Sequence, residues 1–496
     1  MDDLKLYAPS HDKLKELISL VENFSSDISM SFGLDKCKVI NTKEGKCVTG
    51  EVTLETGGLI ESMGDEDLYK YLGYQQAKTI DHKNIKQALE KEYTSRLTKL
   101  CKTELNSKNL VKAINTLAIP VLTYSFGVIS WTKTDLESLM RKTRVLMTKE
   151  RKHHPKSCTL RMTLPRAEGG RGLIDIENLH NNQVRSLRKH FHTRKQVSEL
   201  HSSICQNDRN YTPLNLADEE EQESGNDLTN DQKHDEWMRR SLHGRYPHEV
   251  NQPHVDKLAS YAWLTSGELM PETEGFFVAI QDQVINTKNY LKHIVRDPQV
   301  LDDRCRKCRE KPETIQHITS ACSMLSQSDY LYRHNQVAAI IHQDICFNRK
   351  LVDTKIQYYK YKPPPVLEKD RVVIYYDRSI ITDRCVPYNR PDIVIWDKNS
   401  REVLIVDVAI PNTHNVISTS AEKKRKYTEL ADEMKRMWQV QKVTIVPIVI
   451  STTGIIPKEL HKNIQILGLH KNTFILLQKA VVLNTTRIVR RFLSQN

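Results

Sequence analysis

The chain has 496 residues, a net charge of +12, a pI of about 9.0 and a mean hydropathy of −0.55. It contains no run of about 18 apolar residues, which argues against a membrane-spanning helix. Its N-terminus has two adjacent acids and no basic region, which argues against a secretory signal peptide. The ten cysteines are mostly scattered and do not suggest a disulfide scaffold, so we expect an intracellular protein of about two to four domains.

The positive charge is concentrated in one part of the chain. Residues 86–200 hold 23 Lys and Arg against 10 Asp and Glu, which accounts for the whole net charge. Clusters of Lys and Arg bind nucleic-acid backbones, and this is the interpretation we favour. A Lys-rich helical surface exposed to solvent is the alternative.

The first predicted elements are a helix over residues 14–28, where apolar residues recur at helical spacing, and a short strand over 37–40. Residues 69–73 (YKYLG) predict a turn between two strands. Charged, periodic segments predict helices from about residue 81 and over 135–147. Residues 155–172 hold Lys156, Arg161, Arg166 and Arg171 among Pro and Gly residues, which predicts a basic loop.

The second half of the chain changes character twice. Residues 217–236 are acidic and poor in apolar groups, which predicts a flexible linker at a domain boundary. Helices are predicted over 237–300 and near 328–345. After the prolines at 363–365, strands are predicted at 372–376, 392–396, 402–410 and 443–450, with a helix over 420–438 before the last strand.

A compact Cys/His segment lies between these regions. Cys305, Cys308, His317 and Cys322 have the spacing C-x2-C-x8-H-x4-C. Three thiolates and an imidazole are the donors of a closed tetrahedral zinc site, which is structural because no position remains for water. Incidental core Cys and His residues are the alternative.

Two carboxylates stand out in the predicted strands. Asp392 opens one strand, and Asp407 lies in the next within the apolar run LIVDVAI. An antiparallel hairpin would bring both carboxylates to one end of a sheet, where they could hold Mg²⁺ or Mn²⁺ for phosphodiester hydrolysis. A metal would also relieve the cost of burying the Asp407 charge.

A nuclease site of the PD-(D/E)xK kind also needs a lysine two residues after the second acid, where this chain has Ala409. Lys423, Lys426 and Tyr427 share one face of the predicted helix that follows. We expect Lys426 to fill the role, with Lys423 and Tyr427 assisting. Asp377 is a candidate further acid. The alternative is a solvated basic helix beside a salt-bridged aspartate.

With these residues in view, the chain resembles, over almost its whole length, the C-terminal part of a non-LTR retrotransposon polyprotein of the early-branched type that carries a restriction-like endonuclease. Asp2 and Asp3 in MDDLKLYA resemble the paired aspartates of the reverse-transcriptase (F/Y)-x-D-D box. The segment FGLDKCKVI (32–40) resembles motif D, with Lys36 as the counterpart of its lysine. Tyr71 and Gly73 resemble the primer-grip turn.

Further segments extend the resemblance. LPRAEGGRGL (164–173) is similar to a stretch after the thumb, and the resemblance implies nucleic-acid contacts for Arg161, Arg166 and Arg171. SLHG (241–244), ETEGFFVAIQDQ (272–283) and ETIQHITSAC (313–322) resemble the linker and its CCHC zinc knuckle. RPD (390–392), Asp407 and EKKRKY (422–427) resemble the endonuclease, where the family's lysine lies on that helix.

The resemblance implies a multidomain α+β fold. Its expected parts are a partial reverse-transcriptase palm at 1–84, a basic helical thumb at 85–200, an acidic linker at 201–236, a helical linker domain at 237–300, a zinc knuckle with a flanking helix at 301–350, and an α/β PD-(D/E)xK-like endonuclease at 366–496. It also implies structural Zn²⁺, catalytic Mg²⁺ or Mn²⁺ and no small-molecule cofactor. The expected partners are target DNA and the element's RNA in the nucleus, without a membrane.

The family acts in target-primed reverse transcription, in which the endonuclease nicks chromosomal DNA and the freed 3′-hydroxyl primes cDNA synthesis. The chain begins inside the palm, without the motif A aspartate that would share two metals with Asp2. We therefore expect a 5′-truncated copy, or a gene model begun at an internal Met, that does not polymerise alone but retains endonuclease activity. The alternatives are a non-catalytic nucleic-acid-binding remnant and a pseudogene product that does not accumulate.

Overall fold

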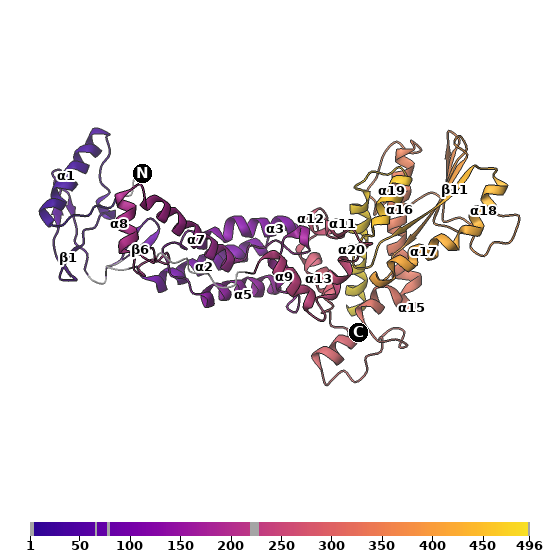
Figure 1. Cartoon of the computed structure of the whole chain (residues 1–496), viewed down its shortest axis with the longest axis horizontal. Helices are drawn as coiled ribbons and strands as arrows, with labels where there is room; N and C mark the ends of the chain where they lie inside the picture. The colour runs from indigo at the N-terminus through magenta and orange to yellow at the C-terminus, as the bar shows by residue number, and fades with distance from the viewer. Residues whose placement is uncertain (1–3, 65–66, 77–79, 219–227, 495–496) are drawn as a thin grey trace. The chain divides into compact units, whose positions relative to one another are not determined.

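The structure is a computed structural model that describes residues 4–64, 67–76, 80–218 and 228–494. It confirms the mixed α+β class: about half of the residues are helical, and a five-stranded mixed sheet lies near the C-terminus (Figure 1). The chain divides into two compact units. The first comprises Met1–Arg96, Ile119–Leu139 and Ile176–Glu223, and the second comprises Leu97–Ala118, Met140–Asp175 and Ser224–Asn496. The finer division into six parts stays a prediction.

The first unit combines helices with small two-stranded sheets. Its helices are α1 (His11–Asp27), α4 (Pro120–Thr123), α7 (Ile176–Lys195), α8 (Glu199–Asn207), most of α2 (His82–Cys101) and the first part of α5 (Lys133–Lys149). Its strands pair as β1 (Asn41–Lys43) with β2 (Lys46–Val48), β3 (Val52–Thr53) with β4 (Leu59–Ile60), and β5 (Tyr69–Tyr71) with β6 (Tyr74–Gln76). Helix α1 confirms the predicted helix. Ser10 caps its N-terminus, and the Ser10 hydroxyl accepts a hydrogen bond from the Lys13 N–H.

The predicted strand over residues 37–40 is wrong. A short 3₁₀ helix, η1 (Leu34–Lys36), precedes Cys37, and Val39 makes only an isolated bridge to Ser62. Regular pairing begins at β1 instead. The turn predicted in YKYLG is confirmed: Leu72 and Gly73 link β5 to β6 with φ of 47° and 85°. A tight hairpin turn needs such positive φ values, which Gly adopts without strain.

The acidic linker predicted at 201–236 contains the boundary between the two units, but about half of its described residues are helical. Cys205 on α8, with Leu214 and Leu216, packs against α7. Residues 230–236 lie in α9 (Asn230–Arg239), which begins with a capping box at Thr229. Residues 219–227 lie outside the described part of the chain. Local hydrophobic contacts and a helix cap therefore stabilise regular structure in a segment whose overall composition predicts a flexible linker.

The second unit contains the remaining helices and the large sheet. Its helices are α3 (Ser107–Ala113), α6 (Leu160–Thr163), α9, α10 (Arg245–Val250), α11 (Lys257–Ser260), α12 (Ala262–Thr265), α13 (Pro271–Gln281), α14 (Lys288–Tyr290), α15 (Ser323–Leu325), α16 (Leu331–Asn348), α17 (Val416–Lys426), α18 (Thr428–Met437), α19 (Lys458–Ile466) and α20 (Thr473–Ser494), besides the last part of α2 and of α5. None of the helices in the described part of the chain is long and apolar enough to span a membrane.

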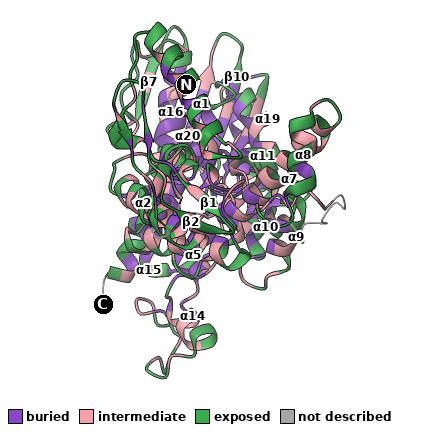
Figure 2. Ribbon diagram, turned by 90° about the vertical axis from the view of Figure 1, so that its left-hand side faces the viewer, coloured by how far each residue is buried: buried purple, intermediate pink, exposed green. Residues whose placement is uncertain are grey.

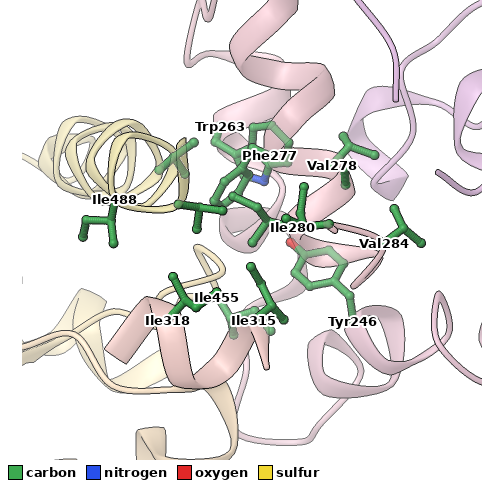
Figure 3. Packing of buried hydrophobic residues seen from close by; sticks show 14 of the residues in the cluster. Tyr246, Trp263, Phe277, Val278, Ile280, Val284, Ile315, Ile318, Ile455 and Ile488 are labelled. Carbon is green, nitrogen blue, oxygen red and sulfur yellow. The ribbon is translucent and has the colours of Figure 1, made fainter. Parts of the chain in front are cut away.

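One hydrophobic core of this unit joins distant segments. Trp263 and Phe277 meet edge to face with ring centroids 5.0 Å apart, and Ile488 of α20 packs in the same cluster (Figure 3). Cys305 and Cys322 belong to this core as well. The Cys/His segment is therefore anchored in the interior of the unit.

The large sheet has the strand order β11-β10-β9-β8-β7. Its strands are β7 (Val366–Lys369), β8 (Val372–Tyr376), β9 (Ile393–Asp397), β10 (Glu402–Ala409) and β11 (Lys442–Val449). Neighbours pair antiparallel except β10 and β11, which are parallel and joined through α17 and α18. The strands predicted from the sequence are confirmed to within one residue at most ends.

Alternate residues of the strands face opposite sides of this sheet. Ile395 and Val406 pack in one cluster with α16, α19 and α20, whereas Val394 and Ile405 pack in another with α18. Figure 2 shows how deeply α16 and α20 are buried. Asp407 alternates with Val406, so its side chain belongs to the α18 side.

Candidate functional site

The four predicted zinc ligands converge. One donor atom from each of Cys305, Cys308, His317 and Cys322 lies within 4.8 Å of the others, the one such group of three or more His, Cys, Asp or Glu in the described part of the chain. The sulfurs of Cys305 and Cys322 are 3.9 Å apart, and the Cys308 sulfur is 3.3 Å from His317 Nε2. Two sulfurs bound at about 2.3 Å to a tetrahedral ion lie about 3.8 Å apart, so the donor set fits Zn²⁺.

Backbone contacts and one tyrosine fix these ligands. The Cys305 N–H donates to the Lys311 carbonyl at 2.8 Å, which closes the turn that carries the first two cysteines. The Tyr330 hydroxyl accepts from the Cys322 N–H at 3.2 Å and donates to the Ile318 carbonyl at 2.7 Å. Ligands held in this way are oriented before a metal arrives.

The electrostatics of the cluster favour a bound cation. Burial, with the neighbouring Cys305 and Cys308 sulfurs, raises the pKa of Cys322 to about 12. Burial also opposes ionisation of Cys308, but backbone hydrogen bonds at Lys311 and Glu310 outweigh it and lower the pKa of that thiol. Burial lowers the pKa of His317 and keeps the imidazole neutral, the form that binds a metal. Three thiolates are stable side by side only with a cation among them.

The second candidate site lies at one end of β9 and β10. The ladder between these strands ends with Ile393 paired to Val406. Asp392 and Asp407 are the next residues outward on each strand, and the Asp392 carboxylate accepts from the Val408 N–H at 2.6 Å. The hairpin thus brings the two acids to the same end of the sheet, as the sequence predicts.

The carboxylate of Asp407 is buried; its Oδ1 accepts a hydrogen bond, whereas its Oδ2 faces an ammonium group but accepts no hydrogen bond from the described residues. The Lys423 ammonium lies 2.7 Å from Oδ2, and the Tyr427 hydroxyl donates to Oδ1 at 2.7 Å. Burial and the Asp407 charge raise the pKa of Tyr427, so the phenol remains a donor. Lys426 Nζ is 4.0 Å from Oδ1 and donates to the Tyr427 hydroxyl at 3.0 Å.

This geometry refines the predicted roles on the helix. The single helix predicted over 420–438 is broken at Tyr427, which separates α17 from α18. Lys423, Lys426 and Tyr427 all reach the Asp407 carboxylate, but Lys423 makes the direct ion pair. Lys423 therefore lies closer to Asp407 than Lys426 does, and which lysine takes the place of the one missing at Ala409 stays a prediction.

One residue of this site escaped the sequence analysis. His334 of α16 places Nε2 3.1 Å from Asp392 Oδ2 and 3.1 Å from the Val408 carbonyl oxygen. Burial lowers the pKa of His334, but the hydrogen bond and the charge of Asp392 outweigh burial and raise it to about 9. No spacing motif links a helix residue to a strand so far along the chain, so only the fold reveals the contact.

Asp377 does not join the two acids. Arg390 binds it through Nε at 2.9 Å and Nη2 at 2.8 Å, and both side chains are more than half exposed. The Asp377 N–H donates to the Asp392 carbonyl at 2.8 Å. In this structure Asp377 therefore pairs with a cation at the rim of the site.

The donors at the strand ends fit a hard divalent ion. Two carboxylates and the Val408 carbonyl oxygen are the oxygen ligands that Mg²⁺ and Mn²⁺ take in proteins. Asp392 and Asp407 are the residues that would hold such an ion. Lys423 compensates the charge of Asp407 and Tyr427 donates to Oδ1, but the buried Oδ2 accepts no hydrogen bond within the described part of the chain, which is consistent with a ligand atom for an ion.

The structure corrects the assignment of two arginines as nucleic-acid contacts. Arg161 is fully buried and pairs with Asp282 at 2.9 Å. Arg171 is 1% exposed and pairs with Glu274 at 2.9 Å, and Arg166 is bound to the same carboxylate. A phosphate backbone needs exposed cations, whereas these guanidinium groups hold the interior of the second unit together.

The remaining predicted residues lie in the first unit. Lys36 is exposed at the end of η1, Tyr71 ends β5, and Gly73 forms the hairpin turn. Their nucleic-acid and polymerase roles stay predictions. Asp2 and Asp3 lie outside the described residues.

Comparison with known proteins adds no assignment. No protein-family model matches the chain, and no curated protein matches it.

Proposed function

We propose that the chain is part of a non-LTR retrotransposon reverse transcriptase/endonuclease and carries a metal-dependent DNA endonuclease in residues 366–496. The observation that carries the proposal is the grouping of Asp392, Asp407 and Lys423 at one end of β9 and β10. Two acids and a lysine at the end of a mixed sheet are the groups that phosphodiester hydrolysis requires.

The side chains would divide the work as follows. Asp392 and Asp407 would hold a divalent ion, which would supply Lewis-acid activation of the scissile phosphate and of water. The partly exposed Lys423 ammonium beside Asp407 orients the attacking water and stabilises the charge that develops on the phosphate. The Tyr427 hydroxyl keeps the Asp407 carboxylate in one orientation.

The zinc cluster has a structural role in this proposal. Its four donors leave no open position for a substrate or water. Because Cys305 and Cys322 belong to the same core as Trp263 and Phe277, a bound Zn²⁺ stabilises the unit that also contains the nuclease sheet.

A non-catalytic nucleic-acid-binding remnant is the second candidate. One observation favours it: Lys423 pairs with Asp407 and Tyr427 donates to its Oδ1, as expected for a structural ion pair. In that case the basic residues of the chain bind nucleic acid without cleaving it.

Cleavage of supercoiled plasmid by the purified, zinc-loaded full chain separates the candidates. The endonuclease nicks the plasmid with Mg²⁺ or Mn²⁺ and stops when EDTA is added. A remnant retards the plasmid in a gel without converting it to the open circular form.

A further inference from the structure

The imidazole of His334 lies against oxygen atoms from both strands of the candidate nuclease site. Its Nε2 is 3.1 Å from Asp392 Oδ2 on the β9 side and 3.1 Å from the Val408 carbonyl on β10. Its Nδ1 is 3.1 Å from Asn335 Oδ1. One ring nitrogen thus points at two oxygens, while the other has a partner of its own.

This arrangement places three donor types around one point. The carboxylate of Asp392 and the carbonyl of Val408 are oxygen donors, and Nε2 becomes a nitrogen donor once a metal ion displaces its proton. The three come from α16, from the residue just before β9 and from β10, so the packing of a helix on the sheet is what assembles them. The ordinary alternative is a charged imidazolium that merely pairs with Asp392.

We propose that His334 is a metal ligand of the nuclease site, acting with Asp392 and the Val408 carbonyl, and that it directs the site toward Mn²⁺ rather than Mg²⁺. This inference rests on the proposed endonuclease and deepens it. Mg²⁺ is held by oxygens and water, whereas imidazole nitrogen suits first-row transition ions. A histidine in the ligand set therefore favours Mn²⁺.

Pulsed EPR of Mn²⁺ bound to the zinc-loaded full chain tests the proposal without any cleavage assay. A directly bound imidazole nitrogen modulates the electron spin echo of Mn²⁺. We expect this ¹⁴N signal in the unaltered protein and its loss in His334→Gln. Loss of a residue that only supports a metal ligand typically lowers metal affinity about 10- to 100-fold. We expect His334→Gln to lower the Mn²⁺ affinity by at least this factor and the Mg²⁺ affinity by less.

His461→Gln is the matched control. His461 also lies on a helix of the second unit, and its Nε2 is 3.0 Å from Asp256 Oδ2. This pair has the same chemistry as His334 and Asp392 but does not contribute to the site. His461→Gln should keep both the ¹⁴N signal and the Mn²⁺ affinity.

The outcomes separate the ligand from the endonuclease. Bound Mn²⁺ without a ¹⁴N signal in the unaltered protein overturns the role of His334, even if His334→Gln does not fold. So does a signal that persists in His334→Gln. If Asp392→Asn abolishes Mn²⁺ binding and His334→Gln does not weaken it, the proposed endonuclease stands and the ligand role fails. Absence of Mn²⁺ binding beyond the zinc cluster overturns both.

Discussion

Lys423 Nζ lies 2.7 Å from Asp407 Oδ2, although one side chain comes from α17 and the other from the buried end of β10. The neighbouring Lys424 faces elsewhere and pairs with Glu459. The two lysines carry the same charge and lie on the same helix, but only Lys423 reaches Asp407. Their comparison isolates the contribution of position from that of charge.

Lys423→Ala should abolish most cleavage. Removing a group that positions or activates the reacting water typically costs about 10²- to 10⁴-fold in rate. Lys424→Ala should change the rate by less than about 3-fold, because an exposed ion pair contributes little. Single-turnover cleavage of a labelled duplex measures both. Equal losses in the two variants would indicate that only the overall charge of α17 matters.

The Cys/His cluster should hold about one zinc per chain. Cys305→Ser should lose the metal and lower the thermal midpoint, because Cys305 belongs to a hydrophobic core. Metal analysis after dialysis, together with thermal unfolding, measures both effects. Cys385→Ser is the control, since Cys385 is an exposed free cysteine. Full zinc content in Cys305→Ser would contradict the ligand assignment.

The buried carboxylate of Glu274 should be among the most sensitive positions in the second unit. It is 0% exposed and pairs with Arg166 and Arg171. Glu274→Gln leaves the buried Arg171 and the partly buried Arg166 without a counter-charge, which should cost about 3–5 kcal/mol. In the control Glu236→Gln, the partly exposed pair with Arg240 should cost under about 1 kcal/mol. Urea unfolding compares the two, and similar midpoints would refute the structural role of the buried arginines.

His342 should make the stability of the second unit depend on pH. The imidazole is fully buried against Tyr361 and Cys346, and burial lowers its pKa from 6.5 to about 4. Between these two pKa values, the unfolded chain binds a proton at this histidine and the folded chain does not. Neutral His342 therefore contributes fully to the free energy of unfolding above about pH 6.5. This contribution, about 3 kcal/mol, is lost as the pH falls toward about 4.

Urea midpoints of the full chain between pH 4 and 8 measure this dependence. The slope of stability against pH should flatten in His342→Gln, which has no titrating ring. It should stay unchanged in His470→Gln, because His470 is exposed. An unchanged slope in His342→Gln would show that other groups govern the acid sensitivity.

The sequence predicts most of what is local. Strand alternation around Asp392 and Asp407 identifies the hairpin, and the spacing of Cys305 and Cys308 identifies the turn of the metal cluster. Both patterns lie within short windows, where periodicity and spacing translate directly into geometry.

Long-range contacts are what the sequence does not reveal. Arg161 and Arg171 occur in a Gly- and Pro-containing segment that looks like an exposed basic loop, but Asp282 and Glu274 neutralise them from more than 100 residues away. His334 on helix α16 likewise contacts Asp392, which lies far along the chain just before strand β9. In each case the partner is known only once the core that brings it close has formed.

The most direct test of the endonuclease is cleavage by the full chain compared with Asp407→Asn, with DNA binding measured in parallel. The account predicts that the unaltered chain nicks supercoiled plasmid with Mn²⁺ or Mg²⁺, and that Asp407→Asn binds the same plasmid with unchanged affinity but loses nicking. Equal nicking by both proteins, or none from a folded and zinc-loaded chain that binds the divalent ion, would contradict it.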